Sequence, residues 1–207
     1  MSEASRIASV HTLNPPSDLI ELSREACGQA GFDYDWSERK LTDATYATTI
    51  DSGNATIYLV FDPVDDIKNH SSFFVNFAEH LRPYNWEEDE QYREFLDASI
   101  ELLCRLFNLS NAEYVSLFTD SDYNTTVPSD LPLADQIDKV PRIGIYSESL
   151  LQDFGGLAGL FDEPRWEGSN PPWRVGELDN GSLLVITHPR PWTDGGWTES
   201  SYVDLHP

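Results

Sequence analysis

The chain has 207 residues, of which 13 are Lys or Arg and 36 are Asp or Glu, so its formal net charge at pH 7 is −23. Hydrophobic residues make up 40% of the chain, which is enough for a packed core and excludes a wholly disordered protein. The charge excludes nucleic-acid binding through phosphate neutralisation, and it excludes an anionic membrane surface as partner, because both need a cationic surface.

The acidic charge is spread along the whole chain. Residues 1–50 carry −4, residues 51–100 carry −8, residues 101–150 carry −5 and residues 151–207 carry −6, and only three of the 13 basic residues are Lys. This even distribution favours adaptation to very high salt over a dedicated acidic patch, because at about 1 M salt the screening length is roughly 3 Å and like charges hardly repel. The composition resembles that of haloarchaeal cytoplasmic proteins.

The predicted elements begin after a loose polar lead-in at residues 1–16. Ser17 is placed to cap a helix that carries Leu and Ala on one stripe and ends near Gly28 or Gly31. Residues 46–61 first alternate, then turn, and then run on as a mostly apolar segment. This pattern predicts a β-hairpin, and Asp62-Pro63 is expected to end its second strand.

Two helices are predicted in the middle of the chain. Residues 71–82 are expected to form the first, because Phe73, Phe74 and Phe77 recur on one side. Residues 86–107 form the strongest predicted helix of the chain, with apolar residues at helical spacing. Its first turns are expected to carry four carboxylates that complement the helix dipole, from Glu87, Glu88, Asp89 and Glu90.

The second half of the chain alternates strands with short helical and polar segments. Residues 113–119 and 141–146 are predicted strands, and residues 120–139 between them form a polar loop that exceeds the usual connection length. Ser147 is placed to cap a helix that ends at Gly155-Gly156, and Leu157 is placed for the hydrophobic contact that closes such an end.

A second hairpin is predicted at residues 173–187, where Asn180-Gly181 suits a tight turn with positive φ at both positions. Strands joined by hairpins predict a mainly antiparallel sheet with amphipathic helices packed on it, which is an α+β fold. We therefore expect a single domain over residues 17–192, followed by a polar tail over residues 193–207.

The sequence predicts a cytoplasmic protein. It contains no stretch of about eighteen apolar residues, and its first ten residues lack the apolar segment of a secretory signal. Cys27 and Cys104 each fall inside a predicted amphipathic helix without a CxxC spacing, so they are expected to be reduced, buried thiols.

Motifs of known chemistry are absent from the sequence, including GxGxxG, the P-loop, HExxH and GxSxG. His188 and Asp194 make a conceivable metal pair, but a single His after a strand is more often a surface residue. Asp62, Asp65 and Asp66 could bind Mg²⁺ or Ca²⁺ or serve a carboxylate- or metal-dependent hydrolase, although a solvated turn explains them more simply. We therefore predict no catalytic residue, no cofactor and no metal ligand.

Binding to a protein partner is the remaining class of function. Trp192 and Trp197 lie in a Pro- and Gly-rich segment, and Trp is enriched at protein interfaces. The run Glu87, Glu88, Asp89 and Glu90 is a candidate acidic contact, with a solvated helix start as the alternative. These six residues are the predicted partner-binding positions.

Two segments carry a family resemblance. Ile143-Gly144-Ile145-Tyr146-Ser147 precedes a short helix and Gly155-Gly156, and residues 181–187 form a glycine-led apolar strand that ends at Thr187. Over residues 86–192 this arrangement resembles the C-terminal half of immunity proteins of bacterial polymorphic-toxin and type VI secretion systems. Unlike those proteins, the chain has no tryptophan beside Gly144 and no further C-terminal helix pattern.

The resemblance implies a cytoplasmic, non-enzymatic protein that binds and blocks a cognate toxin, and it supplies no catalytic residue. Together with the composition, it predicts an immunity-type binding protein in a halophilic cell. A hydrolase and a structural or regulatory partner protein are the alternatives.

Overall fold

The computed structural model describes residues 6–12, 19–31, 39–40, 46–51, 56–64, 71–80, 89–119, 132–162 and 172–187. The strands are β1 Arg6–Thr12, β2 Arg39–Lys40, β3 Tyr46–Asp51, β4 Thr56–Val64, β5 Ser71–His80, β6 Ala112–Thr119, β7 Ile143–Tyr146, β8 Arg174–Glu177 and β9 Leu183–Ile186. The helices are α1 Leu19–Gln29, α2 Asp89–Leu109, α3 Leu133–Gln136, α4 Glu148–Asp153 and α5 Leu157–Leu160. None of these helices is long and apolar enough to cross a lipid bilayer.

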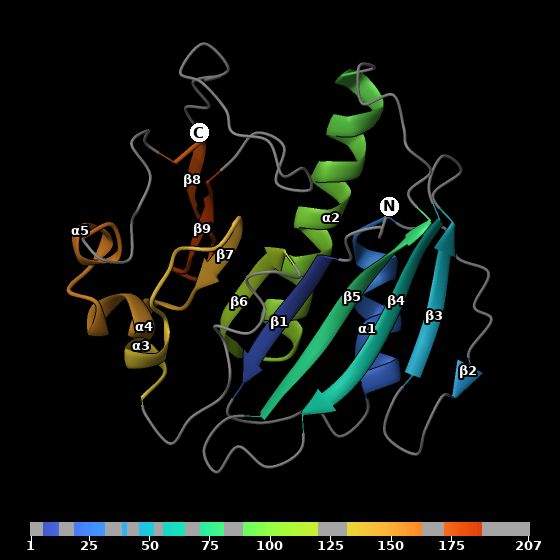
Figure 1. Ribbon diagram of the computed structural model, residues 1–207, viewed down its shortest axis with the longest axis horizontal. Helices are drawn as coiled ribbons and strands as arrows, with labels where there is room; N and C mark the ends of the chain where they lie inside the picture. The colour runs from blue at the N-terminus through green and yellow to red at the C-terminus, as the bar shows by residue number, and fades with distance from the viewer. Residues whose placement is uncertain are drawn as a thin grey trace.

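The strands form one sheet in the order β2-β3-β4-β5-β1-β6-β7-β9-β8, and every neighbouring pair is antiparallel (Figure 1). Helices α1 and α2 pack against each other, and α2 also contacts β6. The short helices α3 and α4 contact each other, and α4 contacts β6. The predicted α+β class with a mainly antiparallel sheet is confirmed.

The central strands send alternate side chains into two separate cores, as the two-residue period of a strand requires. Val115 and Leu117 of β6 join a large apolar cluster with α1 and α2. Tyr114 of the same strand joins a smaller cluster with α3, α4 and α5, which also contains Tyr146 and Phe154. The two faces of one strand therefore serve two cores.

The end of α2 is tied to the sheet by polar contacts as well as by packing. The Thr12 hydroxyl donates to the Ser110 carbonyl oxygen at 2.8 Å, across 98 positions of sequence. Asn111, which begins the turn into β6, has φ +50°. The Asn180 side-chain amide donates to the Asn108 side-chain oxygen at 3.0 Å, so the β8–β9 turn lies against the end of α2.

The N-terminal segment corrects a prediction. Residues 1–16 were expected to be a loose lead-in, but Arg6–Thr12 is β1, which pairs with β5 on one side and β6 on the other. Ala8 and Val10 are fully buried. The local sequence of this short segment of small and polar residues does not indicate a central strand, because the strands that pair with it, β5 and β6, come from distant parts of the chain.

The helix predicted at residues 71–82 is also wrong, because Ser71–His80 is strand β5. Phe73, Phe74 and Phe77 do recur at helical spacing, but aromatic residues favour strands as well. β5 pairs along its length with both β4 and β1. Central strands do not show the clean alternation that identifies a strand with one solvated face, so the pattern was ambiguous.

Strand β4 continues through Asp62-Pro63, where it was expected to end. Pro63 lacks an N–H and is normally excluded from the middle of a sheet. Here β3 pairs with β4 only as far as Phe61, opposite Tyr46, whereas β5 continues to pair as far as Val64. Pro63 therefore lies where β4 has a described partner strand on one side only.

Several local predictions are confirmed, including the β3–β4 hairpin, the long helix α2, strands β6 and β7, and the Ser147 cap, whose hydroxyl accepts the Leu150 N–H at 3.2 Å. The predicted loop at residues 120–139 contains the short helix α3. The β8–β9 turn is a three-residue loop, because Leu178 accepts from the Gly181 N–H and only Gly181 has a positive φ. The predicted tail, residues 193–207, lies outside the described residues.

Candidate functional site

A row of aromatic rings crosses the sheet beneath the short helices. Tyr114 of β6 lies directly opposite His11 of β1 and Tyr146 of β7. The rings of His11 and Tyr114 stack at 5.4 Å between centroids, and those of Tyr114 and Tyr146 lie 5.1 Å apart. Phe154, at the end of α4, meets the Tyr146 ring edge-on at 6.3 Å. The row therefore joins the centre of the sheet to α4.

A second row, made of small residues, lies two positions along the same strands. Ser116 lies directly opposite Ser9 on one side and Gly144 on the other. A Cβ on Gly144 would meet the hydroxyl oxygen of Tyr146 at 2.7 Å. The Tyr146 ring therefore lies back over Gly144, which accounts for the glycine at this position.

Three hydroxyl groups gather where these rows meet, from Tyr114, Ser116 and Tyr146, and we call them the hydroxyl cluster. All three side chains are 0–1% exposed. Burial raises the pKa of Tyr114, while the nearby hydroxyls of Ser116 and Tyr146 lower it. Burial also raises the pKa of Tyr146, and the neighbouring Tyr114 adds to that rise. Burial therefore favours the neutral form of both phenols.

The described cysteines are equally unreactive. Burial raises the pKa of the Cys27 thiol to about 12. Burial, aided by Glu101, raises the pKa of the Cys104 thiol to about 11, against the opposing effect of Arg105 and Arg174. Both residues are free thiols; Cys27 is buried, as predicted, whereas Cys104 is only partly buried. Both stay protonated at neutral pH, where only a thiolate would be a nucleophile or metal ligand.

Helices α4 and α5, which pack on the tyrosine row, form a tight structure. We call it the α4–α5 corner, and it comprises residues 147–162. The Gly155 N–H donates to the Gln152 carbonyl at 2.9 Å, and the Gly156 N–H donates to the Leu151 carbonyl at 2.7 Å. Both glycines have positive φ, as this type of helix ending requires. The predicted end of α4 at Gly155-Gly156 is confirmed.

Gly159 closes the corner so tightly that no side chain fits. A Cβ at this position would lie 1.7 Å from the backbone oxygen of Phe154. Leu160 is fully buried beneath the corner, whereas Leu157 is 46% exposed. The expectation that Leu157 makes a closing hydrophobic contact is therefore wrong. Leu157 is the one exposed large hydrophobic residue in the described part of the chain.

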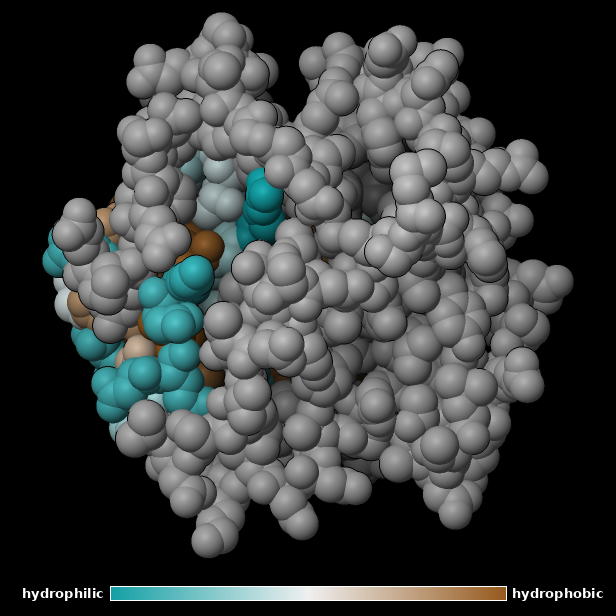
Figure 2. Space-filling model, in the orientation of Figure 1, coloured by the Kyte–Doolittle hydropathy of each residue, from teal (hydrophilic) through white to brown (hydrophobic). Residues whose placement is uncertain are grey.

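Acidic side chains surround this leucine in sequence. Glu148 and Asp153 of α4 and Asp162 beyond α5 are all exposed. Figure 2 shows hydrophilic side chains on this side of the molecule, with smaller hydrophobic areas between them. The corner thus carries both an exposed apolar residue and exposed carboxylates on a constrained backbone.

Most of the predicted partner-binding positions cannot be compared with this corner. Trp192, Trp197, Glu87 and Glu88 lie outside the described residues. Asp89 and Glu90 are the first two residues of α2, as expected for an acidic helix start, but their side chains are not among those described.

The side chains of the predicted cation-binding or hydrolase group, Asp62, Asp65 and Asp66, also lie outside the described part of the structure. Asp62 lies inside β4, with its side chain outside the described set, and Asp65 and Asp66 are not described, nor are His188 and Asp194. Within the described ranges no three His, Cys, Asp or Glu residues are grouped so that they could hold a metal ion.

The sequence alone indicated neither the hydroxyl cluster nor the α4–α5 corner as a candidate site. Tyr114 and Ser116 lie two apart in a strand, as do Gly144 and Tyr146, so each pair was expected to share a face. Nothing local, however, indicates that β6 and β7 would be adjacent in this register. For the corner, the available sequence signal was the large apolar residue Leu157 directly after the predicted helix end at Gly155-Gly156.

No protein-family model matches the sequence, and no curated protein sequence matches it. Among solved structures, the chain is similar to the Pseudomonas aeruginosa T6SS protein PA0821, with 9% identity and a TM-score of 0.41, over 88% of this chain and 68% of that chain. This is a distant structural likeness without a shared sequence family.

Proposed function

We propose that this protein is a non-enzymatic binding protein of the immunity type, which neutralises a cognate toxin by covering it. The exposed Leu157 on the α4–α5 corner carries the proposal. A leucine that is half exposed on a monomer contributes favourable free energy when a partner covers it, up to about 1.5–3 kcal/mol for a whole side chain.

The backbone of the corner supports a binding role. Two glycines of positive φ fix the end of α4, and Gly159 seats α5 against the Phe154 carbonyl. A contact residue on a constrained backbone loses little conformational freedom when it binds, so more of the contact energy appears as affinity.

The exposed carboxylates of the corner favour a partner whose contact surface is basic. Glu148, Asp153 and Asp162 would attract it and repel acidic proteins. We also propose that the protein works at molar salt, as its overall charge of −23 favours. At that ionic strength charge steering is largely screened, so the apolar contact has to supply most of the affinity.

The segments that resemble immunity proteins lie beside this corner. Strand β7 leads directly into the Ser147 cap of α4. The Glu148 carboxylate lies 3.5 Å from where a Cβ on Gly181 would be, so the β8–β9 turn is close to the start of α4. The resembling residues therefore support the surface that we propose to bind.

The test is co-expression with the product of a neighbouring gene that encodes a toxin domain. We expect the wild-type protein to restore growth and to co-elute with the toxin at molar salt. Leu157→Asp should weaken the complex and the protection at least tenfold, because it places a charge in an apolar contact. Gln29→Glu is the matched control, since it also adds one negative charge at an exposed position but lies on α1, outside the α4–α5 corner.

Both variants must unfold at the same denaturant concentration as the wild type. Failure of the wild-type protein to protect against any toxin encoded beside it would refute the immunity function. Protection and binding that Leu157→Asp leaves intact would refute only the assignment of the surface.

A further inference from the structure

The hydroxyl cluster has a polar demand that the described protein groups do not meet. The Tyr114 and Tyr146 phenols and the Ser116 hydroxyl are buried, and none of them makes a hydrogen bond of good geometry, although the Tyr114 hydroxyl lies within reach of the other two. A buried polar group without a partner destabilises a fold, and native proteins carry few of them. Three such groups at neighbouring positions require a common explanation.

The three hydroxyls are close together because of the strand register. Tyr114 is opposite Tyr146, and Ser116 is opposite Gly144. The Tyr146 ring lies back over Gly144, so its hydroxyl comes to the same row as Ser116. The Tyr114 hydroxyl lies within hydrogen-bonding reach of both others.

The row beneath these hydroxyls is made of small side chains. Ser9, Ser116 and Gly144 lie side by side across β1, β6 and β7 and contribute at most two side-chain atoms each. Ser9 and Ser116 are nevertheless 0–1% exposed. The cluster is therefore polar and shielded from bulk solvent, which are two of the conditions under which proteins hold internal water.

We propose that one internal water molecule binds between the Tyr114, Tyr146 and Ser116 hydroxyls and hydrogen-bonds to all three. A water molecule donates twice and accepts twice, and each hydroxyl donates once and accepts, so three contacts can be satisfied together. Buried waters typically make about three hydrogen bonds of this kind. The water joins β6 to β7 beneath α4, because Tyr146 also contacts Phe154.

The alternative is that the hydroxyls are unused by-products of packing. The two explanations predict opposite effects of removing one oxygen atom. Deleting an unpartnered buried hydroxyl leaves stability unchanged or raises it, whereas deleting a partner of a bound water lowers stability. Phenylalanine keeps the ring of tyrosine and removes only its hydroxyl, so it separates the two cases.

The experiment measures urea unfolding of the full chain at molar salt for Tyr114→Phe, Tyr146→Phe and the double variant. We expect each single variant to lower the folding equilibrium constant about fivefold, as for one lost hydrogen bond. The double variant should lower it by less than the product of the single effects, because the two phenols share one water. A single variant that matches or exceeds wild-type stability would overturn the proposal.

Serine variants give a matched control. Ser99 of α2 is as completely buried as Ser116 and also lacks a hydrogen-bond partner, but it belongs to no such cluster. We expect Ser116→Ala to destabilise and Ser99→Ala to be neutral or stabilising. If both serine variants behave alike, the cluster has no special role.

A crystal structure of the wild-type protein provides the second measurement, which does not depend on how the variants fold. It should show one ordered water within about 3 Å of all three oxygens. Direct hydrogen bonds among the three hydroxyls, with no water between them, would contradict the proposal.

Discussion

The two faces of the β6–β7–β9 region are built from the same strands but have different chemistry. Toward α1 and α2, the strands contribute only aliphatic side chains, from Val115, Leu117, Ile143, Ile145, Leu184 and Ile186. Toward α3, α4 and α5, β6 and β7 contribute Tyr114, Ser116, Gly144 and Tyr146. One face is an ordinary apolar core, and the other combines rings with buried hydroxyls.

This difference indicates how the two layers contribute. The aliphatic face has two long helices to cover it and can supply most of the stability by burial alone. The aromatic face is covered by three short helices of four to six residues each, which could not hold their structure in isolation. Caps, glycine turns and ring contacts must therefore fix the α4–α5 corner in place.

The largest effect is expected in the apolar core. Leu103 of α2 is fully buried in the cluster beneath α1 and α2. Leu103→Ala should lower the free energy of unfolding by about 2–5 kcal/mol, because it removes apolar contacts and leaves a cavity. Urea unfolding would measure this, with Leu157→Ala as the exposed control, expected to change stability by less than about 0.5 kcal/mol. Equal effects would mean that Leu157 is part of a core.

The aromatic side has its own sensitive position at Gly159. A methyl group there would collide with the Phe154 carbonyl oxygen, so Gly159→Ala should cost about 1–3 kcal/mol through displacement of α5. Gly176→Ala, in β8, is the control, because a Cβ there meets nothing within 4 Å. Hydrogen exchange should show faster exchange at residues 157–161 in the Gly159 variant and unchanged exchange in α2.

Alkaline pH should report on the apolar side through its buried thiols. The pKa of Cys27 is raised to about 12 in the fold, from an ordinary value of 9.0, so the folded protein retains a proton that the unfolded chain loses. The stability contributed by the neutral thiol is therefore complete below pH 9 and is lost as pH rises from 9 to 12, by about 1.4 kcal/mol per pH unit.

The slope of the free energy of unfolding against pH tests this prediction between pH 9 and 10. Tyrosine has an ordinary pKa of 10.0, so its ionisation contributes less to the slope in this range than at higher pH. Cys27→Ala should have a shallower slope than the wild type, and the residual slope should come largely from Cys104, whose pKa is raised to about 11. Identical slopes would show that Cys27 ionises as readily in the fold as in the unfolded chain.

The cap of α4 should have a moderate effect. Ser147→Ala removes the acceptor of the Leu150 N–H and should cost about 1 kcal/mol. Ser147→Asp should retain most of the stability, because a carboxylate also accepts that N–H. If Ser147→Asp were as unstable as Ser147→Ala, the cap would not be the reason for the loss.

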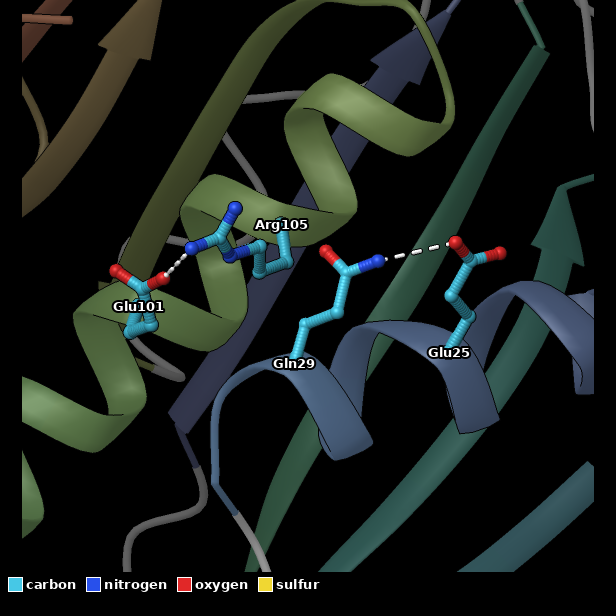
Figure 3. Close-up of polar contacts among 4 residues, drawn as sticks. All are labelled: Glu25, Gln29, Glu101 and Arg105. Carbon is cyan, nitrogen blue, oxygen red and sulfur yellow. Dashed lines mark hydrogen bonds and ion pairs between the residues drawn. The ribbon is translucent and has the colours of Figure 1, made fainter.

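The smallest effect is expected on the outer surface of the apolar layer. Figure 3 shows the Glu101–Arg105 ion pair on α2, at 2.5 Å, and the Gln29–Glu25 hydrogen bond on α1, at 3.0 Å. Both link residues four apart on one helix. Because the charged pair is about 40% exposed, Arg105→Gln should cost about 0.3–0.5 kcal/mol in dilute buffer and nothing measurable at molar salt.

The sequence predicted the fold class and several elements well, and the misses share a cause. The α2 helix, the β3–β4 hairpin and the Ser147 cap depend on residues close together in the chain. Strand β1 pairs only with distant strands, and β5 pairs with the distant β1 as well as with the neighbouring β4, and these two strands were misassigned. Local patterns cannot report a pairing whose other half lies a hundred residues along the chain.

For the candidate site too, the sequence predicted the feature that depends on nearby residues and missed the one that depends on tertiary packing. The sequence identified the Gly155-Gly156 ending but assigned Leu157 to the interior, because a leucine after such an ending often packs back on its helix. Here Leu160 takes the buried place and Leu157 faces solvent. Which of two nearby leucines is covered depends on the direction of α5, and that direction follows from the close approach of Gly159 to Phe154.

The sequence by itself determined the acidic character of the chain, the amphipathic α2 helix, the turns and caps, and therefore an antiparallel α+β class. Each of these follows from residues within about one helical turn or one hairpin of each other. The tertiary structure decided that Arg6–Thr12 lies at the centre of the sheet, that two tyrosines and a serine meet on one face, and that Leu157 is exposed. These features require strand register between distant segments, which becomes determined only when the two cores pack.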